Sequence, residues 1–361
     1  MTSAIVVGGG ISGIAAAGAL ATAPQPVPRI DVVDRGHRLG GRMAVRTLRH
    51  GPWAGHIVDL GASYFTVGRP EFGALVDDWL ARGLARPWSD RFAVIGADGH
   101  LDVHEGPMRF AAPAGLRSLV ESLAEALPAD VRVRSAAEAG QLRRGTGDRW
   151  ALDVSAVSGA NAPADAEEPR AMPMGADVVG LCQPTSQALQ LLRSSPANDD
   201  LAGLADACAP RRYEPLLSLV AQWPTRSWDA FSGCFVNGDP TIGFIADDGD
   251  RRGDGAAVLV AHSTPGFARP FLSDPDRATE QLVAAVRRLL DIGAPVTAEV
   301  KRWAAARPAT DDGGGADGRF LLDPSGVGVA GDAFSQRPRI EAAWLSGRAL
   351  GSALAALAAA S

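Results

Sequence analysis

The first 34 residues carry apolar and glycine-rich stretches in the order of a strand, a helix and a second strand. Residues 4–7 form a short apolar run, residues 8–13 are rich in glycine, and an Ala- and Leu-rich stretch follows to about residue 23. Three prolines then end the predicted helix, and residues 29–34 (RIDVVD) predict the second strand. The pattern therefore indicates a β-turn-α-β unit.

Further patterns predict the elements in the rest of the chain. Residues 113–127 place apolar side chains at helical spacing and predict an amphipathic helix. Residues 155–175 show no period and predict a disordered or solvent-exposed insertion, whereas residues 247–255 predict a polar turn. Strands are predicted at residues 131–133, 150–154, 177–181, 216–223, 233–236, 257–262 and 327–330, and helices at residues 276–290 and 340–360.

Composition narrows the class of protein. The net charge of −6 argues against a nucleic-acid partner, which calls for a basic surface. Because no stretch of about 20 uninterrupted apolar residues occurs, we expect no membrane span. The N-terminal apolar run lacks a preceding basic region and predicts a strand rather than a signal peptide. Cys182, Cys208 and Cys234 are widely spaced, so we expect three reduced, buried thiols and a cytoplasmic location.

The glycine-rich segment predicts a dinucleotide-binding turn. Gly8 permits a tight turn, Gly10 lets the backbone approach a pyrophosphate, and Gly13 lets the helix pack closely on the strand. Ser12 lies in the first turn of this helix, whose free N–H groups favour an anion. Asp34 ends the next strand, where a carboxylate can hold ribose hydroxyls. At this point NAD and FAD are equally allowed.

Two further segments favour FAD. Arg35 is followed by Leu39, the glycine pair Gly40 and Gly41, and Arg42, which can pair with a phosphate. At the far end of the sequence, a predicted strand ends in Gly331 and Asp332, and the helix beginning near Ile340 can point its N-terminus at a flavin ring. The three signals in this order predict FAD. The loop at residues 333–337 contains no cysteine, so we expect the flavin to be bound non-covalently.

Five segments resemble bacterial renalase-type flavoproteins of the flavin amine oxidase superfamily. They are LGGRM (39–43), DLGASYFT (59–66), GCFV (233–236), RWAAARP (302–308) and RIEAAWLSG (339–347). The resemblance implies an α/β fold of the p-hydroxybenzoate hydroxylase and amine oxidase type. A Rossmann-like, two-dinucleotide-binding FAD domain would comprise residues 1–72, 107–183 and 300–361, and a smaller α+β substrate domain residues 73–106 and 184–299. Ala62 and Ser63 join the candidate cofactor-binding residues.

The resemblance also implies an activity. Renalases oxidise the 2- and 6-dihydro isomers of NAD(P)H, transfer a hydride to flavin N5, and pass the electrons to O2, which gives NAD(P)+ and H2O2. Because the nitrogen lone pair of a dihydropyridine already drives hydride loss, this chemistry needs a flavin held at close range and no general base. We expect Trp303, His262 and Tyr64 to face the substrate, although each of them could equally be a structural residue. Arg69 and Arg269 are weaker candidates for binding phosphate.

Two other functions remain open from the sequence. Lys301 lies beside Trp303, near the place where amine oxidases carry a lysine, so an amine oxidase or a related desaturase is a second candidate. A flavin-binding redox sensor without turnover is a third. His100 and His104 could share one face of a strand, but with no third ligand apparent we expect an exposed strand edge and no metal site.

Overall fold

The computed structural model describes residues 2–145, 149–157, 171–196, 199–309 and 319–360. The chain divides into two compact units, each built from separate segments. The first unit comprises residues 1–41, 120–212 and 308–361, and the second residues 42–119 and 213–307. The predicted domains differ from this division. Residues 42–72, 107–119 and 300–307, which are assigned to the predicted FAD domain, lie in the second unit. Residues 184–212, which are assigned to the predicted substrate domain, lie in the first unit. The hydrophobic cores explain two of these differences, because residues 48–60 pack in the core of the second unit and residues 188–208 in that of the first.

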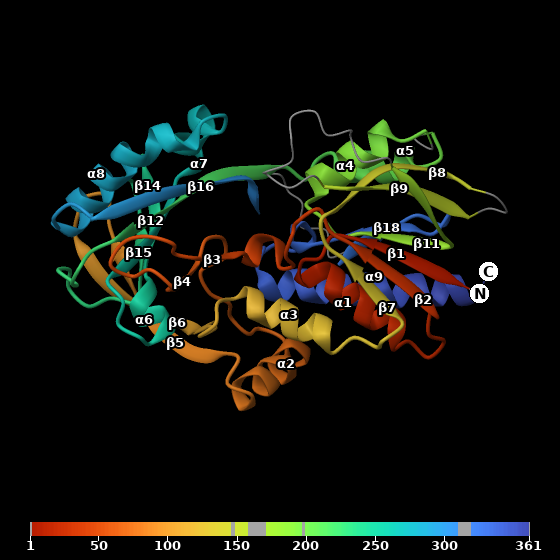
Figure 1. Ribbon diagram of the computed structural model, residues 1–361, viewed down its shortest axis with the longest axis horizontal. Helices are drawn as coiled ribbons and strands as arrows, with labels where there is room; N and C mark the ends of the chain where they lie inside the picture. Colours follow the sequence, from red (N-terminus) through yellow and green to blue (C-terminus); the bar gives the residue numbers. More distant parts are fainter. Residues whose placement is uncertain (1, 146–148, 158–170, 197–198, 310–318, 361) are drawn as a thin grey trace. The chain divides into compact units, whose positions relative to one another are not determined.

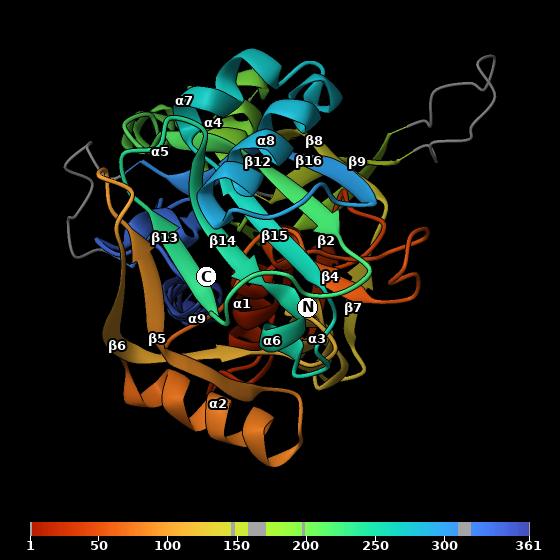
Figure 2. The ribbon, with the colours of Figure 1, turned by 90° about the vertical axis from the view of Figure 1, so that its left-hand side faces the viewer.

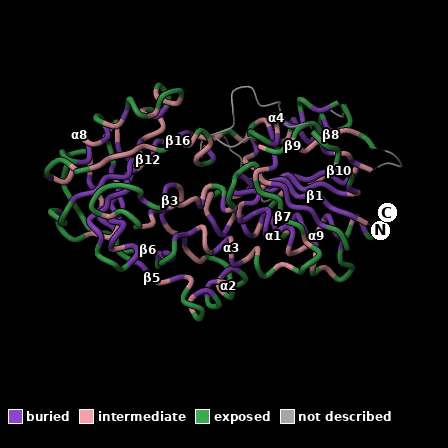
Figure 3. Tube along the Cα trace, viewed as in Figure 1, coloured by how far each residue is buried: buried purple, intermediate pink, exposed green. Residues whose placement is uncertain are grey.

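A six-stranded sheet forms the centre of the first unit. Its strand order is β17-β18-β11-β1-β2-β7, and all neighbours are parallel except β17 and β18. Strands β1 and β11 are buried along their whole length, as expected for a parallel sheet covered on both faces (Figure 3). The strands are β1 (Ser3–Val7), β2 (Arg29–Val33), β7 (Val131–Arg134), β11 (Val178–Leu181), β17 (Phe320–Leu322) and β18 (Val327–Ala330).

Helices α1 (Ile11–Ala21) and α9 (Ile340–Ala360) lie side by side against this sheet (Figure 1). Their backbones touch, since a Cβ atom on Gly347 would overlap the Ser12 carbonyl oxygen and one on Gly351 the Ala16 carbonyl oxygen. Among the described residues, α9 is the one helix long and apolar enough to pass a composition test for a membrane span. Half of that stretch is buried in the fold, as in the core helix of a globular protein.

Other elements of the first unit share a core with the same sheet. It combines the sheet residues Ile5 and Val179 with Trp150 of the antiparallel sheet β10-β9-β8 and with Leu192 and Leu204 of two short helices. The elements are β8 (Ala137–Arg144), β9 (Trp150–Ala156), β10 (Met172–Ala176), α4 (Thr185–Ser194) and α5 (Ala202–Cys208), with a 3-10 turn at Asp332–Phe334.

The predicted insertion at residues 155–175 needs correction at its two ends. Ser155 and Ala156 continue β9, and Met172–Ala176 pairs with β9 as an antiparallel strand. Met172 is exposed on this strand, so its sequence carries no buried-strand pattern. Residues 158–170 lie outside the described residues.

A seven-stranded sheet forms the centre of the second unit, in the order β16-β12-β15-β14-β13-β5-β6 (Figure 2). Leu282 and Val286 of α8 pack on one face of it, against residues such as Leu219 and Leu259. The strands are β5 (Arg86–Ile95), β6 (Leu101–Ala111), β12 (Tyr213–Gln222), β13 (Gly233–Val236), β14 (Ile242–Asp247), β15 (Val258–Ser263) and β16 (Thr297–Pro308), with a separate pair β3 (Val45–Thr47) and β4 (Ile57–Asp59). The helices are α2 (Pro70–Ala81), α6 (Asp248–Arg252), α7 (Pro265–Ala268) and α8 (Thr279–Leu290), with 3-10 turns at Gly41–Met43, Arg269–Phe271 and Pro275–Ala278.

Two predicted elements differ from the structure. The helix expected at residues 113–127 is α3 (Arg117–Glu125), because Gly115 adopts a φ of +84° and closes a turn with the Ala112 carbonyl before the helix begins. The polar turn expected at residues 247–255 contains the short helix α6, whose Asp248, Arg251 and Arg252 are buried. The remaining predicted strands and helices are present with shifts of a few residues at their ends, and the three cysteines are free and buried as expected.

Candidate functional site

The glycine-rich turn of the first unit fits closely against its own backbone. Gly8 has a φ of +110°, and a Cβ atom on Gly13 would overlap the Gly8 carbonyl oxygen. Helix α1 begins at Ile11, and no side chain among the described residues caps it at Gly10. Ser12 is buried in its first turn. The N–H groups of this turn are therefore available to an anion.

Asp34, which directly follows β2, hydrogen-bonds to the backbone of this turn. Its Oδ2 accepts a hydrogen bond from Gly9 N at 2.5 Å, and its Oδ1 accepts one from Gly36 N at 2.6 Å. Arg35 is exposed, and its guanidinium lies 3.6 Å from the Glu138 carboxylate. The structure thus brings Asp34 to the predicted turn and shows Arg35 in a surface ion pair.

The second glycine pair lies directly beside the first turn. Gly40 N donates to the Gly9 carbonyl at 3.0 Å, and the position of a Cβ atom on Gly41 is 3.7 Å from Gly10 Cα. A Cβ atom on Gly10 itself would meet no atom within 4 Å. Two glycine backbones are therefore adjacent, and the point where a Gly10 Cβ atom would lie is free of other atoms of the described residues. An extended phosphate-bearing dinucleotide fits this arrangement, because it needs N–H donors at a helix start and no side chain in its way.

The predicted third segment also contains a glycine, which is buried. Gly331, with a φ of +157°, follows β18, and a Cβ atom there would meet no atom within 4 Å. Its N–H donates to Ser346 Oγ of α9 at 2.8 Å. Asp332 is buried directly after it, and α9 begins at the buried Ile340.

In the second unit, the DLGASYFT segment runs from the end of β4. Ala62 N donates to the Arg42 carbonyl at 2.9 Å, and a Cβ atom on Gly61 would overlap the same oxygen. The Arg42 guanidinium lies 5.2 Å from the centroid of the Tyr213 ring and donates to the Ala306 carbonyl at 3.3 Å. Ser63 is buried.

Trp303 and His262 meet at one backbone oxygen. Trp303 Nε1 donates to the Leu60 carbonyl at 2.9 Å, and the His262 ring also hydrogen-bonds to this carbonyl. Burial, together with the nearby charge of Arg251, lowers the pKa of His262 to about 4. His262 is therefore neutral at pH 7. Its Nε2 is buried without a hydrogen-bond partner among the described residues, so Nδ1 is the donor to Leu60 and Nε2 presents an unused lone pair.

Tyr64 belongs to an aromatic cluster with Trp88, Phe92 and Phe244. The ring centroids of Tyr64 and Phe92 are 5.3 Å apart, and those of Phe244 and His262 are 6.0 Å apart. Arg109 enters this cluster, with its Cζ 3.9 Å from the centroid of Phe92 and 5.7 Å from that of Tyr64. Sequence reasoning missed Arg109, because nothing in the exposed-looking strand around it distinguishes one arginine from the others.

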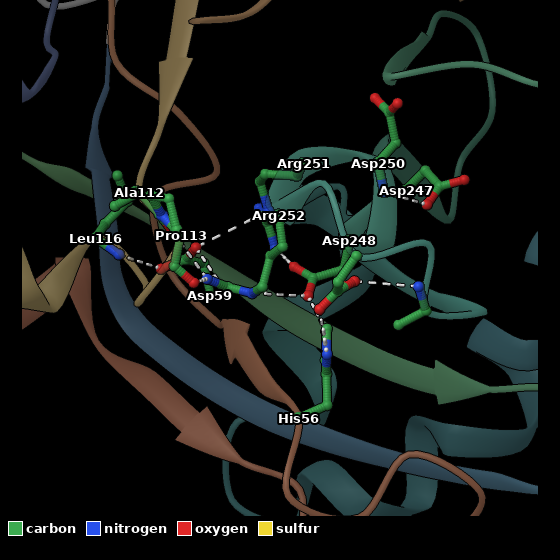
Figure 4. A network of polar contacts seen from close by, with 12 residues as sticks. His56, Asp59, Ala112, Pro113, Leu116, Asp247, Asp248, Asp250, Arg251 and Arg252 are labelled. Atoms are coloured by element: carbon green, nitrogen blue, oxygen red, sulfur yellow. Dashed lines mark hydrogen bonds and ion pairs between the residues drawn. The ribbon is translucent and has the colours of Figure 1, made fainter. Parts of the chain in front are cut away.

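A buried ionic cluster joins Asp59, the first residue of the DLGASYFT segment, to helix α6 (Figure 4). Arg252 Nη2 donates to Asp59 Oδ2 at 2.8 Å, and its Nε donates to Asp248 Oδ2 at 3.2 Å. Arg251 also pairs with Asp248 and donates to the Ser63 carbonyl at 3.2 Å. Asp248 further contacts His56, whose Nε2 lies 2.7 Å from Asp248 Oδ2.

The pKa values of Asp59 and Asp248 in this cluster are shifted in opposite directions. The pKa of Asp59 is raised by burial, although Arg252 and Arg251 oppose this effect. The pKa of Asp248 is lowered, because Arg251, Arg252 and His56 together outweigh its burial. Sequence reasoning also missed this cluster. The signal available was the pair Asp247 and Asp248 followed by Arg251 and Arg252 at helical spacing.

The remaining candidates are exposed. Lys301 lies on the edge strand β16, and Arg69 and Arg269 are on the surface. His104 lies on the edge strand β6, and His100 just before it contacts Asp102, so the prediction of an exposed strand edge is confirmed. The described residues contain no group of three or more His, Cys, Asp or Glu side chains suited to a metal ion.

Comparison with known proteins agrees with this architecture. Residues 6–79 match a family model described as an NAD(P)-binding Rossmann-like domain. The chain is similar to wild-type putrescine oxidase bound to putrescine, with a TM-score of 0.68, 16% identity, and coverage of 98% of this chain and 99% of that chain. A triple mutant from a redesign of cofactor binding in putrescine oxidase gives a TM-score of 0.69 at 15% identity, with the same coverage. The predicted fold class, α/β with a Rossmann-like unit and of the amine oxidase type, is confirmed.

Proposed function

We propose that this protein is an FAD-dependent oxidoreductase that oxidises dihydronicotinamide isomers, with O2 as the electron acceptor. The observation that carries the cofactor assignment is the contact between the Gly8–Gly13 turn and the Gly40–Gly41 pair in the first unit. A nicotinamide dinucleotide needs the first of these segments, whereas the second provides an additional close approach of backbone to phosphate.

The residues that would hold FAD lie along these glycine segments. The first turn of α1 would bind the pyrophosphate, and Asp34 has carboxylate lone pairs left for ribose hydroxyls. Gly331 and Asp332 would hold the far part of the molecule, with Arg42, Ala62 and Ser63 as further candidates. No cysteine lies in residues 333–337, which supports non-covalent binding. When bound, FAD supplies a two-electron acceptor.

The substrate assignment is supported by the chemistry of the second unit. His262 offers a hydrogen-bond acceptor, and Tyr64 and Trp303 offer aromatic surface. A dihydropyridine that carries a carboxamide has a planar ring and an N–H donor that suit these groups. The ring contacts of Tyr64 are with Trp88, Phe92 and Phe244, and the one charged group among them is the Arg109 guanidinium, which does not favour a cationic amine. We further propose a cytoplasmic location, given three free thiols.

An amine oxidase is the second candidate, and the fold shared with putrescine oxidase favours it. Lys301 would then act near the flavin. Lys301 is exposed on β16, so its surroundings do not support this role.

Anaerobic flavin bleaching separates the two functions. The purified protein is reconstituted with FAD and mixed in a stopped-flow instrument with 2-dihydro-NAD(P), 6-dihydro-NAD(P) or putrescine. We expect rapid loss of flavin absorbance with a dihydronicotinamide, no loss with putrescine, and an unchanged rate in Lys301→Met. Bleaching by putrescine that is lost in Lys301→Met would establish the amine oxidase instead.

A further inference from the structure

Arg109 is a buried arginine that forms no ion pair with an acidic side chain of the described residues. The residue is 9% exposed. The guanidinium contacts the Phe92 ring, the Tyr64 ring and, at 3.4 Å, the Pro107 carbonyl. A buried cation without a counter-ion is unfavourable unless another group compensates it. The guanidinium has five N–H donors, of which the Pro107 carbonyl and the Tyr64 hydroxyl take two, so it can donate further to an acceptor oxygen of a ligand.

Tyr64 provides a second donor beside Arg109. Burial raises the pKa of Tyr64, and the charge and hydrogen bond of Arg109 only partly oppose this effect. The hydroxyl therefore stays protonated at neutral pH. Because an arginine cannot accept a hydrogen bond, Tyr64 directs its O–H away from Arg109, toward a ligand or solvent.

The neighbouring rings define the shape and polarity of what can bind here. Trp88, Phe92 and Phe244 surround Tyr64, and Phe244 connects this cluster to His262 with its unused Nε2 lone pair. Two donors, one acceptor and several aromatic faces suit a planar ring that carries a carbonyl or carboxylate oxygen. The same charge opposes an ammonium group, which Arg109 repels.

We infer that Arg109 and Tyr64 bind a carbonyl or carboxylate oxygen on the ring of the substrate, and that Arg109 excludes cationic amines. This inference rests on the proposed function and names the residues that determine its specificity.

The test measures ligand binding without turnover. Nicotinate, nicotinamide and putrescine are titrated into the FAD-loaded protein by calorimetry, for the wild type, Arg109→Gln, Arg109→Lys and Tyr64→Phe. Arg91→Gln is the matched control, because Arg91 is an exposed arginine on the neighbouring strand β5. We expect nicotinate to bind the wild type and putrescine not to bind. Arg109→Gln should weaken nicotinate binding by about tenfold or more, Arg109→Lys by less, and Arg91→Gln not at all.

A spectroscopic readout checks that Arg109 and Tyr64 interact in solution. Loss of the Arg109 charge should raise the pKa of Tyr64 further, as seen by tyrosinate absorbance at high pH, with Tyr64→Phe identifying the signal. If Arg109→Gln does not fold, Arg109→Lys and Tyr64→Phe carry the test. Affinities for nicotinate equal to that of the wild type in these variants would overturn the inference.

The outcomes also distinguish this inference from the proposed function. If dihydronicotinamides do not bleach the flavin but nicotinate binds through Arg109, the proposed function is wrong and the oxygen-binding site stands. If they bleach the flavin with the same KM in Arg109→Gln as in the wild type, the function stands and the role of Arg109 is refuted.

Discussion

Gly13 and Gly10 of the glycine-rich turn are glycines for two different reasons. Gly13 is required by packing, since any Cβ atom there overlaps the Gly8 carbonyl oxygen. Gly10 has no such neighbour within 4 Å and an ordinary backbone conformation, with φ −80° and ψ 178°. A side chain at Gly10 therefore leaves the fold intact and fills only the space proposed for the pyrophosphate.

Gly10→Val should consequently fold and lose FAD. We expect a melting temperature close to that of the apo wild type and at least about tenfold weaker FAD binding, since the side chain displaces phosphate from the N–H donors of α1. The ratio of flavin to protein absorbance measures this. Gly203→Ala is the control, because its Cβ atom also meets no atom within 4 Å but lies in α5, and it should keep its flavin. A fully flavinated Gly10→Val would contradict the assignment.

His262 should make the protein less stable in weak acid. Its folded pKa, about 4, is below the unfolded value of 6.5, so the unfolded chain takes up a proton first as the pH falls. Stability contributed by the neutral ring is complete above pH 6.5 and is lost as the pH falls toward 4. The difference amounts to roughly 2 kcal/mol between pH 8 and pH 5.

Urea unfolding of the wild type and of His262→Asn at pH 8 and pH 5 checks this expectation. The variant should lose less stability over this range by about the same 2 kcal/mol. Equal losses in the two proteins would show that His262 titrates normally in the folded state.

At the scale of elements, α6 is the clearest case in which the local sequence pattern did not predict a buried helix. Residues 247–255 are polar and glycine-containing, which is typical of an exposed turn, yet α6 is buried. Its charges are compensated by Asp59 and His56, which are far away in the sequence. Because a local pattern contains no information on distant partners, hydrophobicity alone could not predict this helix. In contrast, α9 and β13 were predicted with their observed bounds, since their apolar runs are long or sharply delimited.

Arg252→Met should destabilise the second unit strongly, because it leaves Asp59 and Asp248 with fewer buried partners. We expect a loss of about 3–5 kcal/mol in the free energy of unfolding, measured in urea. Arg82→Gln, which removes the exposed pair with Asp78, should cost less than about 1 kcal/mol. Adding Asp59→Asn to Arg252→Met should cost less than the sum of the two single losses, because the carboxylate left unpaired is then neutral. Strict additivity would mean that the two side chains do not interact.

At the scale of the whole molecule, the sequence predicted the fold class and the order of the glycine segments, but not how the chain divides. The fold depends on short motifs with steric requirements, such as Gly8 and Gly13, which a sequence displays directly. The division depends on which apolar side chains share a core. Leu60 and Val258 do so across a long stretch of sequence that no local pattern connects. Arg109 was missed for the same reason, since its aromatic neighbours are Phe92 on β5 and Tyr64 in the segment after β4.

Binding of FAD should stabilise the folded protein by mass action. At a free concentration of 100 times the dissociation constant, one site contributes about 2.7 kcal/mol, provided that the unfolded chain does not bind. The melting temperature of the wild type should therefore rise by several degrees when FAD is added, whereas that of Gly10→Val should not change. A thermal scan with and without FAD measures this. An equal rise in both proteins would place the flavin elsewhere.

The contact of Gly347 and Gly351 with the backbone of α1 has a consequence for how the protein is made. The two helices are separated by nearly the whole sequence, so a ribosome releases α1 long before α9 exists. Until then the apolar side of α1 lacks its partner, and the turn that precedes it lacks its support. Nascent chains arrested before α9 should therefore not retain coenzyme, and acquisition of yellow colour would report that synthesis has passed this point.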